Sequence, residues 1–344
     1  MKPKILLVYT GGTIGMAKDY GDQSLKPFNF DNLIKQIPEL SLIDCQIEYF
    51  SFEKLIDSSD MKPEYWIDIA NVIEENYTKY DGFVVLHGTD TMAYTASALS
   101  FMIDNLEKPV IFTGSQLPIG DLRTDAKENL ITSIQLAALR KKNQPIIQEV
   151  CIYFEYKLFR ANRATKINAE NFDAFESPNY PIIGVSGVHL EVKENLLLPK
   201  TSGDLKINKN LNADVGVLKI FPGMNRCFIE SVLNAPCMKA FIIEAFGTGN
   251  IFTDKWFIDL LKEKVNQGTH LIINTQCSGG MVEIGRYATS DALLEMGAIS
   301  SYDLTMEAAI TKAIYLLGQN LDKEEFRKQY ESNLKGELRH HYYN

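Results

Sequence analysis

The sequence predicts an α/β protein with a larger N-terminal parallel-sheet domain and a smaller C-terminal α/β domain. Three observations support this prediction. The chain has 344 residues, roughly twice the length of an average domain. Short apolar runs alternate with amphipathic stretches, as expected where helices cover a buried parallel sheet. A polar stretch rich in Lys and Asn interrupts the alternation. We therefore expect domains at residues 1–198 and 214–344, with residues 199–213 as their linker.

The strands and helices of the first domain follow from this alternation. Four continuous apolar runs predict buried strands, and the first three lead directly into loops that contain Thr and Gly. These runs are residues 4–9, 82–87, 109–112 and 150–154. Apolar residues at helical spacing predict helices at residues 65–77, 91–103 and 125–139. Residues 182–197 leave room for a direct strand-to-strand link.

The second domain repeats this rhythm on a smaller scale. Its apolar runs predict strands at residues 215–220, 240–246 and 270–274. Its amphipathic stretches predict helices at residues 254–266, 303–317 and 323–332. We therefore expect a second, smaller α/β unit after the linker.

Composition and charge exclude several classes of protein. Hydrophobic residues make up 45% of the chain and charged residues 23%, which is typical of soluble globular proteins. The net charge of −9 argues against a nucleic-acid partner, because such proteins carry a basic surface. No apolar run approaches the roughly 18 residues of a membrane span, so we expect no membrane partner.

Cysteine usage predicts a cytoplasmic location. The five cysteines are widely scattered and form no C-x-x-C pair, which is the pattern of reduced thiols. The apolar run at residues 5–9 is too short for the core of a secretory signal. No H-E-x-x-H motif points to a metal site.

Three loops are candidate functional sites, because ligands of open α/β sheets bind beyond the carboxyl ends of the strands. They are residues 10–15 (TGGTIG), 57–60 (DSSD) and 87–91 (HGTDT). The first loop lacks the glycine spacing of a dinucleotide site and the Gly-Lys pair of a P-loop. Each loop also fits a purely structural role, the first as a tight turn and the other two as helix caps.

Two further side chains have alternative interpretations. His87 is interpreted as a hydrogen-bonded strand-end residue rather than a base, since no other histidine forms a motif with it. Lys166 ends the segment 160–166 (RANRATK) and is a solvated side chain unless it lies beside Thr89. In that position it could act as a base for the threonine hydroxyl.

The four segments TGGTIG, DSSD, HGTDT and Ala164-Thr165-Lys166, in this order, resemble the bacterial-type L-asparaginases. The resemblance spans about residues 4–338, and residues 333–338 (NLKGEL) look like the tail of the type I, cytoplasmic branch. It implies hydrolysis of the side-chain amide of L-asparagine to L-aspartate and ammonia. It also implies that the reaction needs no metal and no other cofactor.

The resemblance implies a catalytic role for four of these residues. Thr13 is expected to be the nucleophile that attacks the amide carbon. Thr89 is the matching second threonine, with Lys166 as its base and Asp90 as its partner. Backbone N–H groups around Thr89 are candidate donors for the oxyanion.

Substrate binding is expected from the DSSD loop and from Asp90. The hydroxyl and backbone donors of Ser58 and Ser59 suit the α-carboxylate of asparagine, and Asp90 suits its α-ammonium. Thr89 also belongs to this set by the resemblance. Asp57 either contacts the substrate or orders the loop.

The residue that activates Thr13 is usually, in this family, a tyrosine of the lid after the first strand. Here the lid is residues 16–27 and its only tyrosine is Tyr20, which we expect to serve. Tyr287 is the alternative and would reach in from a C-terminal domain, including that of a neighbouring subunit. The resemblance suggests a homodimer or homotetramer, with Asn250 as a candidate cross-subunit contact.

Some type I enzymes bind asparagine at a second, allosteric site. Its features map to Thr165, Thr275 and Cys277, and to a position that is arginine in the allosteric enzymes. That position is Glu244 here, and the reversed charge removes the donor for a ligand carboxylate. We therefore expect no allosteric response, with Cys277 as a buried small residue.

Three alternatives stay open. A broader asparaginase/glutaminase is one, because a single methylene is discriminated by only about 1–3 kcal/mol. A subunit of the glutamyl-tRNA amidotransferases is another, although it would need an extra domain and an RNA-compatible surface. A non-catalytic amino-acid sensor on the same scaffold would be expected to lose Thr13, Thr89 or Lys166, and all three are present.

Overall fold

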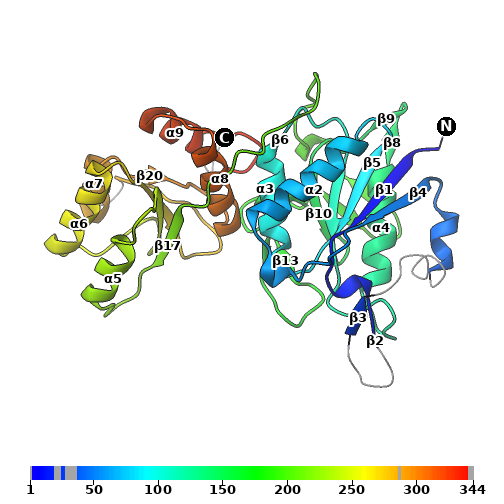
Figure 1. Cartoon of the computed structure of the whole chain (residues 1–344), viewed down its shortest axis with the longest axis horizontal. Coiled ribbons are helices and arrows are strands. Elements are labelled where there is room, and N and C mark those ends of the chain that lie inside the picture. The colour runs from blue at the N-terminus through cyan, green and yellow to red at the C-terminus, as the bar shows by residue number, and fades with distance from the viewer. Residues whose placement is uncertain (1, 19–24, 28–36, 286–287, 340–344) are drawn as a thin grey trace. The chain divides into compact units, whose positions relative to one another are not determined.

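The computed structural model describes residues 2–18, 25–27, 37–285 and 288–339 (Figure 1). The chain divides into two compact units, Met1–Lys209 and Asn210–Asn344, and each is described by itself. The exact domain and linker boundaries expected from the sequence stay a prediction.

An eight-stranded sheet lies at the centre of the described part of unit 1. In order across the sheet, the strands are β15 (Leu190–Val192), β14 (Gly184–Ser186), β11 (Lys157–Arg160), β10 (Val150–Phe154), β7 (Val110–Thr113), β5 (Gly82–Leu86), β1 (Lys4–Tyr9) and β4 (Gln46–Ser51). The strands from β10 to β4 are parallel, whereas β11, β14 and β15 are antiparallel to their neighbours. The predicted parallel sheet is therefore a mixed one, and residues 182–197 contain the β14–β15 hairpin.

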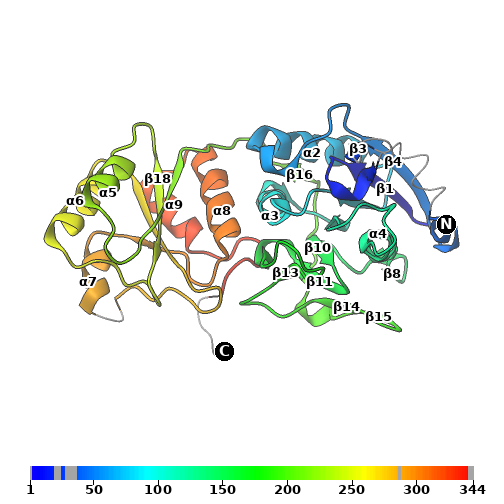
Figure 2. The same ribbon diagram turned by 90° about the horizontal axis from the view of Figure 1, so that it is seen from below.

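Helices cover both faces of this sheet (Figures 1 and 2). The three helices are α2 (Pro63–Asn76), α3 (Met92–Met102) and α4 (Ala126–Ala138). One face is covered by α2 and α3, and the other by α4. Every residue of β5 is buried, which explains why its sequence is continuously apolar rather than alternating.

Short elements complete the described part of unit 1. Four two-stranded pairs are β2 (Met16–Lys18) with β3 (Leu25–Pro27), β6 (Ile103–Asp104) with β16 (Lys206–Ile207), β8 (Arg140–Lys141) with β9 (Gln144–Pro145), and β12 (Thr165–Lys166) with β13 (Phe175–Glu176). Short 3₁₀ helices lie at Thr13–Gly15, Pro38–Leu42, Ser58–Asp60, Ala161–Arg163 and Glu194–Leu196. Two of these, at Thr13 and at Ser58, belong to the predicted functional loops.

Unit 2 contains a smaller parallel sheet between two layers of helices (Figure 2). Its strands are β17 (Val215–Lys219), β18 (Ala240–Ala245), β19 (His270–Thr275) and β20 (Ile299–Ser300). Its helices are α5 (Arg226–Leu233), α6 (Lys255–Asn266), α7 (Ala288–Glu295), α8 (Met306–Gly318) and α9 (Lys323–Tyr330). Ile242 and Ile272 pack with α8 and α9, whereas their neighbours Ile243 and Ile273 pack with α5 and α6. This alternation explains the apolar runs at residues 240–243 and 271–273 of the central strands.

No helix in the part of the chain that the structure describes is long and apolar enough to cross a membrane. The five cysteines, all of which lie among the described residues, are free thiols.

Candidate active site

The carboxyl ends of β1, β5 and β7 lie side by side at one edge of the sheet. Tyr9 pairs with Leu86, and Leu86 pairs with Thr113, so the three strands end in register. The backbone N–H and the hydroxyl of Thr10 both donate to the Leu86 carbonyl oxygen, at 3.1 and 2.9 Å. The loops that follow the strands therefore leave from the same edge, where open α/β sheets bind their ligands.

The three predicted loops pack directly against one another through glycines. A β-carbon at Gly12, whose φ is +91°, would lie 2.5 Å from the Gly88 nitrogen. A β-carbon at Gly88 would lie 2.5 Å from the Ser58 hydroxyl oxygen. Thr91 Oγ1 in turn donates to the Ser58 carbonyl oxygen at 2.7 Å. Only glycine permits these approaches, so the glycines bring together the loops of Thr13, Ser58 and Thr89.

Lys166 joins this cluster from a distant part of unit 1. It lies in β12, whose pairing with β13 presents it to the HGTDT loop, and its Nζ donates to Thr89 Oγ1 at 2.8 Å. The same Nζ forms an ion pair with Asp90 Oδ1 at 2.7 Å. The Lys166 side chain is 15% exposed, whereas that of Asp90 is 68% exposed. The arrangement places an amine against a hydroxyl, with a carboxylate open to solvent beside them.

Asp57 orders the DSSD loop as an N-cap. Its Oδ1 accepts hydrogen bonds from the Ser59 backbone N–H at 2.9 Å and from the Ser59 hydroxyl at 2.8 Å. These bonds hold the pKa of Asp57 below its usual range. The hydroxyl proton of Ser59 is therefore directed at Asp57. Ser58 is buried, at 5% exposed, and faces Gly88.

His87 is a buried, hydrogen-bonded residue at the end of its strand. Its Nδ1 lies 2.7 Å from the Gly88 carbonyl oxygen, and since a carbonyl only accepts, Nδ1 carries the proton. Burial lowers the pKa of His87 to about 4. The ring is therefore neutral at pH 7, and it fixes the Gly88–Thr89 peptide through its N–H.

Gln116 contacts Thr89 and was not among the residues predicted from the sequence. Thr89 Oγ1 donates to Gln116 Oε1 at 3.1 Å. Gln116 lies in the loop after β7, where the buried carboxylate of Asp125 accepts from the backbone N–H groups of Gln116 and Leu117. The sequence feature that could have indicated Gln116 is its position in the loop after a predicted strand, two residues beyond Thr113-Gly114. Its contact with Thr89 depends on a fold that brings two strand-end loops together.

The predicted residues of unit 2 that the structure describes lie near the carboxyl ends of its strands. Thr275 Oγ1 donates to the Gly247 carbonyl oxygen and accepts from the Cys277 backbone N–H. Glu244 Oε1 lies 3.7 Å from Lys219 Nζ. Asn250 closes the turn after β18 through an isolated bridge to Phe246. The remaining predicted member of the second-site set, Thr165, lies in β12 of unit 1, paired with Glu176.

The prediction that Cys277 is a buried small residue is wrong, since it is exposed. It lies in the loop that follows β19, outside the buried strand. Tyr20 and Tyr287 lie outside the described residues. Among the residues that are described, no group of three or more His, Cys, Asp or Glu side chains could hold a metal ion.

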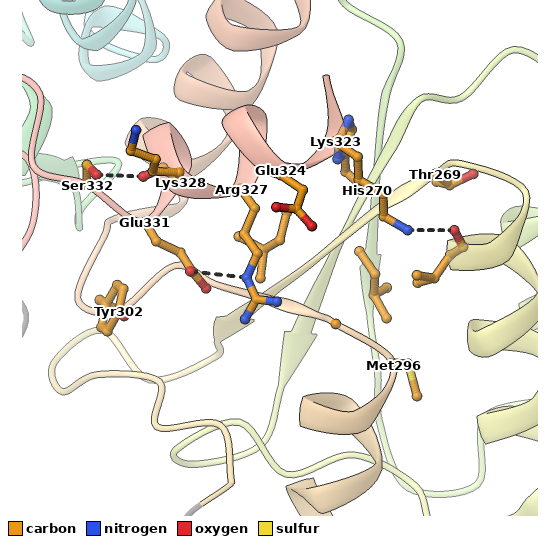
Figure 3. Close-up of a pocket in the computed structure, with 14 residues that line it drawn as sticks. Thr269, His270, Met296, Tyr302, Lys323, Glu324, Arg327, Lys328, Glu331 and Ser332 are labelled. Atoms are coloured by element: carbon orange, nitrogen blue, oxygen red, sulfur yellow. Dashed lines mark hydrogen bonds and ion pairs between the residues drawn. The ribbon is translucent and has the colours of Figure 1, made fainter. Parts of the chain in front are cut away.

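Each unit has a cavity of a size that can hold a small molecule. In unit 1, a cavity of about 550 Å³ is bordered by Gln116, Leu117, Arg123 and residues 169–172, next to the Thr89 contact. In unit 2, a cavity of about 660 Å³ lies over the edge of the small sheet (Figure 3). It contains the ion pair between Arg327 and Glu331 and the ring of His270, and no predicted site residue lines it.

Comparison with known proteins assigns the chain to a family. Residues 4–198 match the family described as "Asparaginase, N-terminal", and residues 214–330 match "Glutaminase/Asparaginase C-terminal domain". L-asparaginase 1 of Escherichia coli K12 is 42% identical over 98% of each chain. The crystal structure of L-asparaginase I from Vibrio cholerae O1 biovar eltor has a TM-score of 0.89 at 41% identity, covering 98% of this chain and 100% of that one. The thermostable L-asparaginase from Thermococcus kodakarensis also has a TM-score of 0.89, at 32% identity over 98% of this chain and 99% of that one. The chain therefore belongs to the bacterial-type asparaginase family, and to its type I branch.

Proposed function

We propose that this protein hydrolyses the side-chain amide of L-asparagine, giving L-aspartate and ammonia through a threonyl ester. One observation carries the proposal: the Lys166 amine contacts both the Thr89 hydroxyl and the Asp90 carboxylate, on a loop that packs against the loop of Thr13. A threonine hydroxyl is a weak nucleophile until a base removes its proton, so an amine in contact with a hydroxyl is an arrangement that such chemistry requires.

The reaction proceeds in two halves. Thr13 Oγ1 attacks the amide carbon and loses its proton to a base, the C–N bond breaks, and the amide nitrogen takes up a proton and leaves as ammonia. Water then attacks the ester carbon, the bond to Thr13 Oγ1 breaks, and the proton of the water returns to Thr13. We assign Thr89 to positioning or activating that water, with Lys166 as its base and Asp90 as the counter-ion of Lys166. The Thr89 backbone N–H is the proposed oxyanion donor, since His87 fixes its peptide.

Charge complementarity accounts for substrate capture. Asp90 is the proposed partner of the α-ammonium, and its exposed carboxylate has room for a second cation besides Lys166. Ser58 is the proposed hydroxyl donor to the α-carboxylate. The hydroxyl of Ser59 donates to Asp57, so Ser59 is proposed to order the loop rather than to donate its hydroxyl to the substrate. Tyr20, with Tyr287 as the alternative, stays the proposed activator of Thr13.

Location and assembly belong to the same proposal. A cytoplasmic location is supported by five free thiols, three of them exposed. We also propose a homodimer or homotetramer, in which Asn250 and Tyr287 contact the site of a neighbouring subunit. Glutamine is the proposed secondary substrate, and roughly 10- to 200-fold discrimination against it follows from its one extra methylene.

Ammonia release from asparagine and from glutamine tests the function. The wild type is expected to release ammonia from asparagine, and Thr13→Ala to lower kcat by at least about 10³-fold because the nucleophile is removed. Thr201→Ala, an exposed threonine far from the site in sequence, is the matched control and should retain full activity. Release from neither amide by the wild type would overturn the enzyme assignment in favour of a binding protein on the same scaffold.

A further inference from the structure

The side-chain amide of Gln116 has a fixed orientation. Gln116 Nε2 donates to the carbonyl oxygens of Ala169 and Asn171, at 3.2 and 3.0 Å. Both partners can only accept, so the NH₂ group must face them and the amide oxygen must face the other way. The opposite amide orientation would place three oxygens together. The partners therefore determine that Oε1 faces Thr89.

This orientation determines the direction of the Thr89 proton. Gln116 Oε1 cannot donate, so the hydroxyl of Thr89 is the donor across the 3.1 Å contact. A hydroxyl has one proton and two lone pairs, and a lone pair thus remains to accept from Lys166 Nζ at 2.8 Å. Gln116 and Lys166 together fix both the χ1 angle of Thr89 and its proton.

The backbone of Gln116 is held as firmly as its side chain. Asp125, which is 7% exposed, accepts from the Gln116 N–H through Oδ2 at 2.9 Å and from the Leu117 N–H through Oδ1 at 3.1 Å. Asn129 is fully buried and donates to the Gly114 carbonyl oxygen and to Asp125. The loop is thus tied to α4 on both sides of Gln116. Such support is what a side chain needs if it is to hold a reacting group within a fraction of an ångström.

We propose that Gln116 is a positioning residue for the hydrolysis, acting through Thr89. The inference rests on the proposed function. Gln116 holds Thr89 in the rotamer that keeps Oγ1 against Lys166, with the hydroxyl proton directed at Gln116 while Lys166 donates. Lys166 serves as the base of Thr89 in its neutral form, when the hydroxyl turns its proton from Gln116 to the amine. Gln116 is not among the proposed substrate contacts. Its removal is therefore expected to affect turnover more than binding.

Steady-state kinetics with asparagine provide the first test. Gln116→Leu has a similar size but no acceptor, and it should lower kcat about 10-fold with KM within about 2-fold of the wild type. Gln116→Asn keeps the amide but is one methylene shorter, and it should show the same split. Leu122→Ala, a fully exposed residue of the same loop, is the matched control and should leave both constants unchanged.

A double-mutant cycle separates positioning from a general loss of structure. Serine lacks the β-branch that restricts χ1 of threonine, so Thr89→Ser should depend more strongly on Gln116. Gln116→Leu is therefore expected to cost about 100-fold in kcat in the Thr89→Ser background, against about 10-fold in the wild type. Equal losses in the two backgrounds, or kcat within 2-fold of wild type for both Gln116 variants, would refute the inference while leaving the asparaginase assignment intact. A wild type that is inactive on both amides would instead refute the proposed function itself.

Discussion

His87 illustrates how one buried side chain links the site to the pH dependence of stability. It donates through Nδ1 to the Gly88 carbonyl oxygen, and burial lowers its pKa to about 4, against 6.5 for an exposed imidazole. The folded state therefore resists protonation of His87, while the unfolded chain accepts the proton readily. Stability from this group is complete above pH 6.5 and is lost progressively as the pH falls to 4.

We expect the free energy of unfolding to contain a His87 contribution that falls by about 2 kcal/mol between pH 7 and pH 5. His87→Asn keeps an N–H donor near Gly88 but does not titrate, so the variant should lack this pH-dependent part. Urea unfolding at the two pH values measures the difference. His189→Gln, at an exposed histidine, is the control and should behave as the wild type. An unchanged pH dependence in His87→Asn would contradict the neutral, buried state of the ring.

Sequence patterns predicted the roles of some site residues and missed those of others. His87 was predicted as a hydrogen-bonded strand-end residue rather than a base; its hydrogen bond is observed, and the absence of a base role stays a prediction. The roles of Thr13, Thr89 and Lys166 stay predictions, although Lys166 does lie against Thr89, 77 residues away in the sequence. Gln116 could not be predicted in its role, because that role depends on two carbonyl groups that a separate loop brings into reach. Local sequence carries no information about such contacts.

At the scale of elements, a strand could be predicted from the sequence when both of its faces are buried. Strands with a continuous buried apolar run, such as β5 and the first four residues of β18, were expected close to their observed bounds. The edge strand β4 was missed, because its side chains are mostly exposed and its sequence, QIEYFS, lacks a continuous apolar run. Helix α5, also missed, has only eight residues, too few to show a clear helical period.

The C-terminal segment is tied to α8 by a fully buried ion pair. Lys312 and Glu337 are both 0% exposed, and Lys312 Nζ also donates to the Ser332 carbonyl oxygen. Glu337 accepts from the backbone N–H groups of Leu334 and Lys335. Burial alone would raise the pKa of Glu337, but the pairing with Lys312 and the backbone donors lower it overall. The segment 333–338, which the sequence resemblance had singled out, is thus anchored to α8 by a buried carboxylate whose charge is paired and hydrogen-bonded.

We expect Lys312→Met to lower the free energy of unfolding by about 3–5 kcal/mol, because it leaves a buried carboxylate without its counter-ion. The double variant Lys312→Met/Glu337→Gln also removes the charge of the carboxylate. Its free energy of unfolding should therefore fall clearly less than that of Lys312→Met. Chemical denaturation measures both. Lys255→Met breaks an exposed pair with Asp259 on α6 and serves as the control, with a change of at most about 1 kcal/mol. Equal losses for Lys312→Met and Lys255→Met would contradict a structural role for the buried pair.

At the scale of the whole molecule, the described residues proposed for catalysis lie in unit 1, whereas most residues of the expected second site lie in unit 2. The loops that contain Thr13, Ser58 and Thr89 pack together in unit 1, on the larger sheet. In unit 2, the matching strand end contains Glu244, whose carboxylate lies 3.7 Å from Lys219 Nζ. The Gln276 amide donates to the carbonyl oxygens of Ile220 and Glu244 beside it. At this corner the donors Lys219 and Gln276 are already engaged by Glu244 and by carbonyl oxygens of the protein, which makes it an unfavourable place for a second carboxylate.

The velocity of asparagine hydrolysis is accordingly expected to depend hyperbolically on substrate concentration. By the sequence resemblance, a second asparagine would bring its α-carboxylate to the position of Glu244, which is arginine in the allosteric enzymes, and like charges repel rather than bind. Initial rates over a roughly 100-fold range around KM should give a Hill coefficient of about 1. Glu244→Arg introduces a cationic donor and is expected to raise the Hill coefficient above 1. The velocity curve of Glu244→Gln is expected to remain hyperbolic. A clearly sigmoidal wild-type curve would show that an effector site persists without an arginine at this position, and that another group of the chain binds the carboxylate.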